Sequence, residues 1–393
     1  MEQSVNAQIH ITWLGSKCRS KQEKAAWSDC VTLYQDTINI LNQALNPTKQ
    51  STSYDLQTWL TTSLTNTDTC QTGFHKVGVG NNVLPLIPNK NISKIISEFL
   101  TLNNASSFIP PKTNKNGFPR WLSPNDRKLL EDFKTIKEAL KAVPKLSPKR
   151  FVIYVKHSVY NENIEYYVVC RSVGGGSTTF NSTNVDGFIA RGITFRNTEG
   201  PENHQAGALR CGADLSVFHR CAFEGYQDTL YVHSQRQFYK ECHIFGTVDF
   251  IFGNAAVVFQ SCNIYATRSM QKQKNAIAAE DPNQNTGICI QNSRVMAVED
   301  LVPVLSSFKT FLGRPWREYS RTVFLQTYLD ALVDLAGVQE RSSWGSTRDR
   351  VKWGGYHAIT SATEASKFTV ENFIAGKSWL PATGIPFLLG LDD

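Results

Sequence analysis

The chain has 393 residues, 41% of them hydrophobic, and its formal net charge at pH 7 is +7 with an isoelectric point near 8.8. This length fits one large domain and one smaller one. The basic residues are scattered rather than clustered, and no apolar run is long enough to span a membrane, so the sequence predicts neither a nucleic acid nor a membrane as a partner.

Residues 1–108 show the apolar spacing of helices, as in a small bundle. The three apolar stripes consist of Trp27, Cys30, Tyr34, Ile38, Leu41 and Leu45; of Leu56, Trp59, Leu60, Leu64, Thr67, Cys70 and Phe74; and of Ile92, Ile95, Ile96, Phe99 and Leu100. Cys30 and Cys70 fall on the buried faces of two helices, where either a bridge or two buried thiols fits the spacing. Three helices make a thin bundle that we do not expect to be stable alone. Residues 1–15 lack the basic and apolar regions of a signal peptide.

Residues 105–127 contain four prolines and little periodicity, which predicts a linker. The linker runs into "DRKLL" at residues 126–130, a dibasic step before two leucines. An exposed linker is a site of proteolysis, so this step fits a processing site. An ordinary helix start fits the same letters.

From about residue 132 the chain consists of short β-rich runs that repeat. The runs "VFHRCAF", "FYKECHIF" and "VFQSCNIY" place cysteines at 221, 242 and 262, in steps of 21 and 20, and "CIQNSRV" places Ser293 in the same slot. A period near 20 with one set of strands per repeat predicts stacked coils of parallel β-structure. A leucine-rich repeat has a similar period, but its leucine consensus is absent.

Four polar residues follow the same period. Gln205, Gln227 and Asp249 are each 22 residues apart, and Asp228 follows Gln227 directly. In stacked coils these side chains would gather on one face, about 4.8 Å apart per coil. Two close carboxylates cannot both ionise easily, which favours one ionised base or nucleophile and one protonated acid. The amides would donate hydrogen bonds to a developing oxyanion. A purely structural ladder of polar side chains fits the spacing equally well.

Five long motifs resemble those of plant pectin methylesterases, in the same order along residues 132–393. They are "HQAGALR" at 204, "GYQDTLYVHSQRQFY" at 225, "GTVDFIFGNAAVVFQ" at 246, "FLGRPWREYSRTVF" at 311 and "WLPATGIPF" at 379. Residues 20–105 resemble the back half of the inhibitor-like pro-region that precedes many of these enzymes. "RKLL" resembles the processing site between the two parts.

The resemblance implies an all-β, right-handed parallel β-helix at residues 131–393, preceded by a truncated α-helical bundle at residues 1–108 and a linker at 109–130. It implies hydrolysis of galacturonate methyl esters in pectin, with methanol and acidic pectin as products and no metal or organic cofactor. Pectin is the expected partner, with a proteinaceous pectinesterase inhibitor as a further one. The resemblance also implies a secreted, monomeric protein of the cell wall.

The resemblance assigns a role to each candidate residue. Asp249 is the nucleophile, Asp228 the acid and then the base, and Gln227 lines the oxyanion hole beside Gln205. Arg314 holds Asp249 ionised, which makes an aspartate among apolar neighbours tolerable. Trp316 packs on the sugar.

The resemblance also places a disulfide between Cys242 and Cys262. On geometry alone, Cys221 with Cys242 would serve as well, because both pairs are one coil apart.

The chain departs from the family pattern at several points. After "IEYYVVC" it passes straight to "RSVGGGSTTF", where the family has a further strand and turn, about one coil. Ser158 replaces a family glycine, "AGVQERSSWGSTRDRVKW" replaces a segment with two tryptophans, and Val338 replaces an aromatic residue. The bundle lacks its first hairpin. An alternative function is therefore a catalytically impaired protein that still binds pectin.

Overall fold

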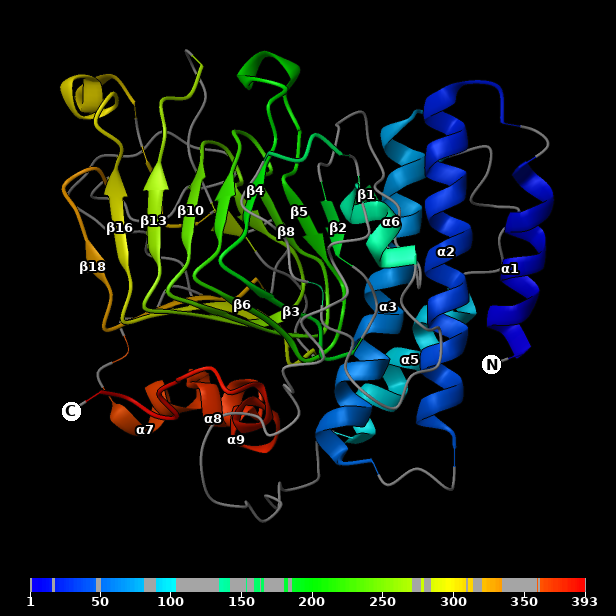
Figure 1. Ribbon diagram of the computed structural model, residues 1–393. Helices are drawn as coiled ribbons and strands as arrows, with labels where there is room; N and C mark the ends of the chain where they lie inside the picture. The colour runs from blue at the N-terminus through cyan, green and yellow to red at the C-terminus, as the bar shows by residue number, and fades with distance from the viewer. Residues whose placement is uncertain are drawn as a thin grey trace.

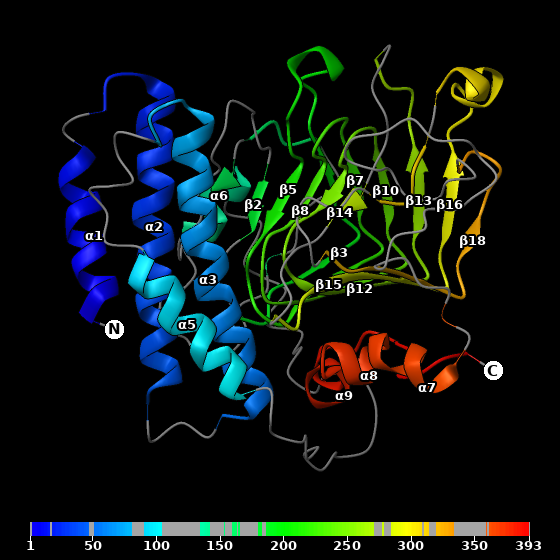
Figure 2. The same ribbon diagram turned by 180° about the vertical axis from the view of Figure 1, so that it is seen from behind.

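The protein consists of a helical bundle that lies beside a stack of parallel strands, with short helices under the stack (Figures 1 and 2). The structure is a computed structural model. It describes residues 2–15, 18–46, 51–80, 90–103, 134–141, 153, 159–162, 164–165, 180–182, 186–270, 277–278, 284–308, 310–313, 320–333, 359 and 361–392. In this part of the chain no helix is both long and apolar enough to cross a lipid bilayer.

The bundle contains four helices in the described residues. They are α1 (Glu2–Leu14), α2 (Lys21–Ala44), α3 (Ser53–Lys76) and α5 (Lys90–Asn103). The three stripes correspond to α2, α3 and α5, whereas α1 was not predicted. The core of the bundle includes Ile11 from α1, Leu33 from α2 and Leu100 from α5. Leu45 and Phe99 are 65% and 56% exposed, so the predicted stripes were wrong at these two positions.

Local sequence signals set where the two long helices begin. The Ser20 hydroxyl accepts a hydrogen bond from the Glu23 amide at the start of α2. At the start of α3, Thr52 and Asp55 form a reciprocal capping box, in which each side chain accepts from the other residue's amide. Such caps satisfy amides that a helix leaves without partners.

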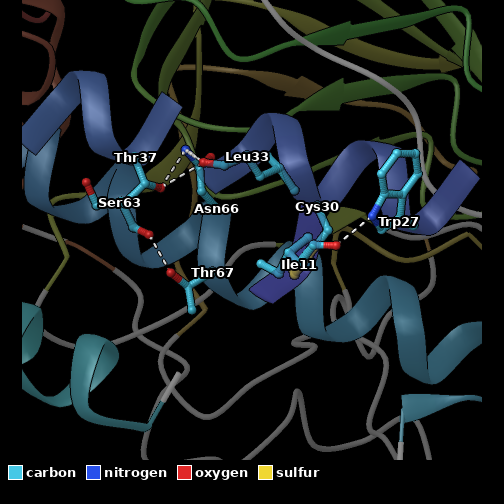
Figure 3. The surroundings of a disulfide bond; sticks show 9 residues. Ile11, Trp27, Cys30, Leu33, Thr37, Ser63, Asn66 and Thr67 are labelled. Carbon is cyan, nitrogen blue, oxygen red and sulfur yellow. Dashed lines mark hydrogen bonds between the residues drawn. A yellow bond between two sulfur atoms is a disulfide. The ribbon is translucent and has the colours of Figure 1, made fainter. Parts of the chain in front are cut away.

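A disulfide joins α2 to α3 through Cys30 and Cys70, so the bridge that the spacing allowed is present. Figure 3 shows its surroundings: the Trp27 indole donates to the Ile11 carbonyl, 2.7 Å away, and ties α1 to α2. Asn66 of α3 donates to the Leu33 carbonyl of α2 at 3.3 Å. The bridge and these bonds hold three of the four helices together.

The rest of the described chain forms a parallel β-helix, as predicted. Every strand pair is parallel, and each coil passes from sheet B to sheet C to sheet A. Sheet A contains β1 (Ile164–Glu165), β2 (Phe180–Ser182), β5 (Leu209–Cys211), β8 (Leu230–Val232), β11 (Ile251–Phe252) and β14 (Ile277–Ala278). Sheet B contains β3 (Ile189–Arg191), β6 (Ser216–His219), β9 (Arg236–Lys240), β12 (Ala256–Gln260), β15 (Gly287–Gln291) and β17 (Thr322–Leu325). Sheet C contains β4 (Thr194–Arg196), β7 (Ala222–Glu224), β10 (His243–Gly246), β13 (Asn263–Ala266), β16 (Arg294–Ala297) and β18 (Tyr328–Leu329).

One corner of the coil, between sheets B and C, is built the same way five times. The residue before each cysteine slot has a left-handed backbone. These residues and their φ angles are Arg220 (53°), Glu241 (54°), Ser261 (56°), Asn292 (48°) and Gln326 (47°). Ser293 occupies the cysteine slot as predicted, and its hydroxyl accepts from the Cys262 amide at 3.0 Å. The repeat of 20 to 21 residues is therefore the repeat of this corner.

Stacked side chains fill the interior of the β-helix. The rings of Phe218, Tyr239 and Phe259 stack in successive coils, with 4.6 Å between neighbouring centroids. Like residues one coil apart contact each other over their full faces, which is the packing that a repeat with matched register allows.

The outer face of sheet B is apolar and is covered by the C-terminal helices, which lie below it in Figure 1. These are α7 (Ala362–Ala365), α8 (Val370–Phe373) and α9 (Gly376–Trp379), with the short 3₁₀ segments η6 (Ser366–Phe368) and η7 (Leu380–Thr383). Two further 3₁₀ segments, η4 (Pro201–Asn203) and η5 (Val302–Ser307), lie in connections between strands. Phe238 and Val258 of the sheet pack with Trp379 and Leu380.

The short helix α6 (Ile136–Lys141) agrees with the helix expected at "TIKEA". The Glu162 carboxylate accepts from the amides of Ile136 and Lys137 at its start. Glu162 therefore caps α6. The predicted linker and "RKLL", together with Ser158 and Val338, lie outside the described residues.

Candidate active site

The four polar residues predicted to gather lie at one corner of the coil, where sheet C passes into sheet A. Gln205 and Gln227 form a parallel bridge between neighbouring coils. Asp228 and Asp249 each come two residues before a strand of sheet A, and those strands pair Leu230 with Ile251. The structure thus brings two amides and two aspartates to the same corner.

The register differs in one respect from the predicted spacing of 22. Asp249 lies opposite Asp228, 21 residues earlier, and Gln227 lies opposite Val248. The Asp228 amide donates to the Val248 carbonyl at 3.0 Å. The first coil contains one residue more at this corner than the second, because the chain between Gln205 and β5 is longer by one residue than that between Gln227 and β8. The two carboxylates are therefore direct neighbours.

Both aspartates have a left-handed backbone, with φ of 63° at Asp228 and 46° at Asp249. Residues other than glycine adopt this conformation at a cost, and it is found mostly where the surroundings enforce it. Here Thr229 does so, because its hydroxyl lies 3.0 Å from the carbonyl oxygens of Tyr226 and Phe245. The turn fixes the direction in which both carboxylates leave the backbone.

The two aspartates differ in burial. Asp249 is 3% exposed, and its neighbours Val248, Phe250 and Ile251 are also buried. Asp228 is half-buried. One carboxylate is thus removed from water while its neighbour on the adjacent coil keeps contact with it.

The outward face of sheet A carries aromatic residues beside this corner, which the sequence reasoning missed. Leu230 and Val232 point into the core, so Tyr231 between them points outward. Tyr231 stacks on Phe252 of the next coil with 4.4 Å between ring centroids. The alternation of apolar and aromatic letters in "TLYVH" was the signal that could have revealed them.

Arg314 and Trp316, the other two predicted site residues, lie outside the described residues.

Cys221, Cys242 and Cys262 form a buried column at the corner between sheets B and C. All three are free thiols, so the predicted disulfide between Cys242 and Cys262 is not present. Cys242 interacts with the sulfur atoms of both neighbours, and burial raises the pKa of its thiol well above the usual value. Because the column places Cys242 equally between two partners, stacking alone does not select one pairing.

The helical bundle packs along the opposite edge of sheet A. Thr65 and Thr69 of α3 contact Asn254 and His233, at 2.9 and 3.0 Å, in the turns that follow β11 and β8. Asp29 of α2 forms an ion pair of 3.0 Å with Arg210 of β5. Sheet A thus has the four polar residues at one edge and the bundle at the other.

The comparisons with known proteins cover both parts of the chain. A family model described as Pectinesterase matches residues 128–169 and 167–346, and one described as Plant invertase/pectin methylesterase inhibitor matches residues 1–102. The two Pectinesterase segments meet at residues 167–169, where the sequence passes directly from "IEYYVVC" towards "RSVGGG".

Two curated relatives are similar along the whole chain. "Pectinesterase 2" of Citrus sinensis is 50% identical over 446 positions, covering 100% of this chain and 87% of the relative. "Probable pectinesterase/pectinesterase inhibitor 17" of Arabidopsis thaliana is 49% identical over 448 positions, covering 100% of this chain and 86% of the relative. Both alignments are longer than the 393 residues of this chain, so the relatives contain segments without a counterpart here.

Two solved structures resemble the β-helix. A pectin methylesterase from carrot is 46% identical with a TM-score of 0.60, covering 66% of this chain and 95% of the other. A deglycosylated pectin methylesterase from Aspergillus niger is 25% identical with a TM-score of 0.51, covering 64% of this chain and 92% of the other.

Proposed function

Because the chain belongs to the pectinesterase family, whose members are carboxylic ester hydrolases, we propose that it hydrolyses the galacturonate methyl esters of pectin through Asp249 and Asp228. The observation that carries the assignment of residues is the direct stacking of these two aspartates with different burial. Two carboxylates in unlike surroundings can divide the roles of nucleophile and acid.

In the first half of the reaction, a carboxylate oxygen of Asp249 attacks the ester carbonyl carbon. The carbonyl oxygen becomes an oxyanion, and the amide groups of Gln227 and Gln205 donate hydrogen bonds to it. The bond to the methoxy group then breaks, and Asp228 gives its proton to the departing methanol. The product of this half is an anhydride between Asp249 and the galacturonate.

In the second half, Asp228 is a carboxylate and takes a proton from water. The resulting hydroxide attacks the galacturonate carbonyl carbon of the anhydride, and the Asp249 carboxylate leaves. One free galacturonate carboxyl group is formed for each methanol released, and both aspartates return to their initial protonation. Arg314, as the resemblance implies, would keep Asp249 ionised, and Trp316 would contact the sugar.

The stacked pair Tyr231 and Phe252 supports this reading, because flat aromatic faces beside reacting groups suit the apolar faces of sugar rings. We expect pectin to be the binding partner and the cell wall to be the place of action. The disulfide between Cys30 and Cys70 supports an oxidising compartment. A separate inhibitor protein as partner and a monomeric state are further proposals.

A second candidate function is a pectin-binding protein with impaired catalysis. Two observations favour it: the curated relatives contain segments that this chain lacks, and the Pectinesterase match is divided at residues 167–169. A shortened β-helix could retain the corner residues while supporting them less firmly.

Methanol release from highly methylated pectin distinguishes the two candidates. The full chain should release methanol, and Asp249→Asn should abolish the release because an amide does not act as the nucleophile. Asp300→Asn is the matched control, since Asp300 is an exposed aspartate at the far end of β16. Activity of Asp249→Asn equal to that of the control would refute the assignment. A folded chain without activity would favour the second candidate.

A further inference from the structure

The outward face of sheet A carries a row of three residues in register. Arg210 pairs with Tyr231, and Tyr231 pairs with Phe252 on the next coil. Leu209 and Cys211 on either side of Arg210 belong to the core, so the Arg210 side chain lies on the outer face with the aromatic rings. Its guanidinium carbon is 5.3 Å from the Tyr231 ring centroid. The row thus consists of one cation and two aromatic rings.

This row begins close to the proposed catalytic residues. Tyr231 follows Asp228 by three residues along an extended strand, a distance of about 10 Å. Arg210 lies beside Tyr231, one coil away. A polysaccharide chain that places one ester at Asp228 and Asp249 would therefore extend neighbouring sugars over the row.

Arg210 is covered by the helical bundle and faces a carboxylate there. The Arg210 Nη1 atom is 3.0 Å from Oδ1 of Asp29 in α2, and the two side chains are 2% and 0% exposed. Burying two charges is costly unless they pair closely. Asp29 thus places a carboxylate against the outward cation of the row.

The chemistry of the substrate matches that of Asp29. Each galacturonate unit carries either a methyl ester or a free carboxylate, and the proposed reaction converts the first into the second. An arginine binds carboxylates well because its planar donors match the two oxygen atoms.

We propose that Arg210 binds a free carboxylate of the galacturonan chain, and that Asp29 occupies this carboxylate site while the bundle is docked. This inference rests on the proposed function and adds a binding residue to it. Arg210 would favour substrate that already has a free acid beside the ester being cleaved. Asp29 and the substrate then compete for the same guanidinium.

A second ion pair at the same interface provides a matched control. Arg236 lies 2.9 Å from Asp55 of α3. Asp214 of the β-helix also binds Arg236, through bonds of 3.0 and 2.6 Å to its Nε and Nη2 atoms. Removing the Asp55 charge therefore loosens the bundle but leaves Arg236 occupied by Asp214.

The test measures binding of a fully de-esterified oligogalacturonate to the full-length chain by calorimetry. Asp29→Asn should bind the oligomer about tenfold more tightly than the unaltered chain, as expected for one charged hydrogen-bonded pair. Asp55→Asn should bind it less tightly than Asp29→Asn does. Adding Arg210→Gln to Asp29→Asn should remove the gain, whereas Arg210→Lys should keep part of it. Thermal unfolding of each variant establishes that it is folded.

Two outcomes would overturn the proposal. Equal gains from Asp29→Asn and Asp55→Asn would mean that loosening the bundle, rather than freeing Arg210, admits the oligomer. Equal binding by Asp29→Asn with and without Arg210→Gln or Arg210→Lys would mean that Arg210 is not the site. The oligomer has no ester, so its binding is measured without turnover. Failure of the proposed function would appear separately, as absence of methanol release.

Discussion

Asp228 and Asp249 are neighbours on adjacent coils, because Leu230 of β8 pairs with Ile251 of β11. The same turn gives both residues a left-handed backbone. Their spacing is set by the strand pairing of the whole sheet rather than by a flexible loop. Changes that disturb this turn should therefore affect catalysis even where they leave both carboxylates in place.

Replacing Gln227 by alanine should lower kcat by about 10²–10³-fold, as for the loss of one donor to an oxyanion. KM for pectin should change little, since the amide acts mainly on the charge that develops in the transition state. Steady-state methanol release would measure both constants. A rise in KM with unchanged kcat would instead indicate that Gln227 binds the sugar.

Replacing Gly246 by alanine should destabilise the protein by about 1–3 kcal/mol, a typical cost of overpacking. The added methyl group would overlap Cβ of Phe250 and lie 2.8 Å from Oγ1 of Thr229, the residue that holds the turn. We also expect kcat to fall, because Phe250 follows Asp249 directly. Thermal unfolding and methanol release would be compared with Gly390→Ala, whose added methyl group meets nothing within 4 Å. Equal behaviour of the two variants would contradict this account of the turn.

Stability should rise with pH between about 5 and 6.5, in part because of His233. Burial, assisted by the charge of Arg210, holds the pKa of His233 well below 6.5. Below pH 6.5 the unfolded chain binds a proton at this residue and the folded chain does not, so folding loses about 1.4 kcal/mol per pH unit. His219 has a lowered pKa for the same main reason and adds to the slope.

The urea midpoint measured at several pH values would test this expectation. His233→Gln should flatten the dependence without removing it, because His219 remains. An unchanged slope in His233→Gln would show that His233 does not titrate on unfolding.

Restoring the segment that the relatives carry near residue 167 should raise the thermal midpoint and the rate of methanol release. In a stack of coils, each coil depends most on its neighbours, and this position lies one to two coils before Gln205. The comparison needs both versions at equal protein concentration. If the chain as given unfolds at the same temperature and releases methanol as fast, the shorter form is complete as a scaffold.

The sequence predicted the stack of coils well, because a repeated corner leaves a repeated signal. The cysteines at 221, 242 and 262 mark a left-handed residue and a change of sheet in three successive coils. Local spacing could not reveal that Asp249 lies opposite Asp228, since a coil can be longer by one residue at one corner. That difference is set by strand pairing, which depends on residues outside the motif.

Contacts between the two parts of the chain could not be predicted from periodicity. Asp29 and Arg210 are 181 residues apart, and each is a single charge in its own element. The helix α1 also escaped prediction, because Val5, Ile9 and Trp13 on its outer face are apolar and obscure the buried stripe. Tertiary packing decided these features.

The corner before the cysteine slots keeps one geometry while the coils between its copies differ in length. Successive slots are 21 and 20 residues apart at Cys221, Cys242 and Cys262, and then 31 and 34 apart at Ser293 and Thr327. The extra residues lie after sheet C, on the side of the coil that leads towards Gln227, Asp228 and Asp249. Evolution can therefore lengthen or exchange the walls of the catalytic cleft there without altering the hinge line of the stack. A designer who wished to graft new sugar-binding loops onto this scaffold would place them on the same side.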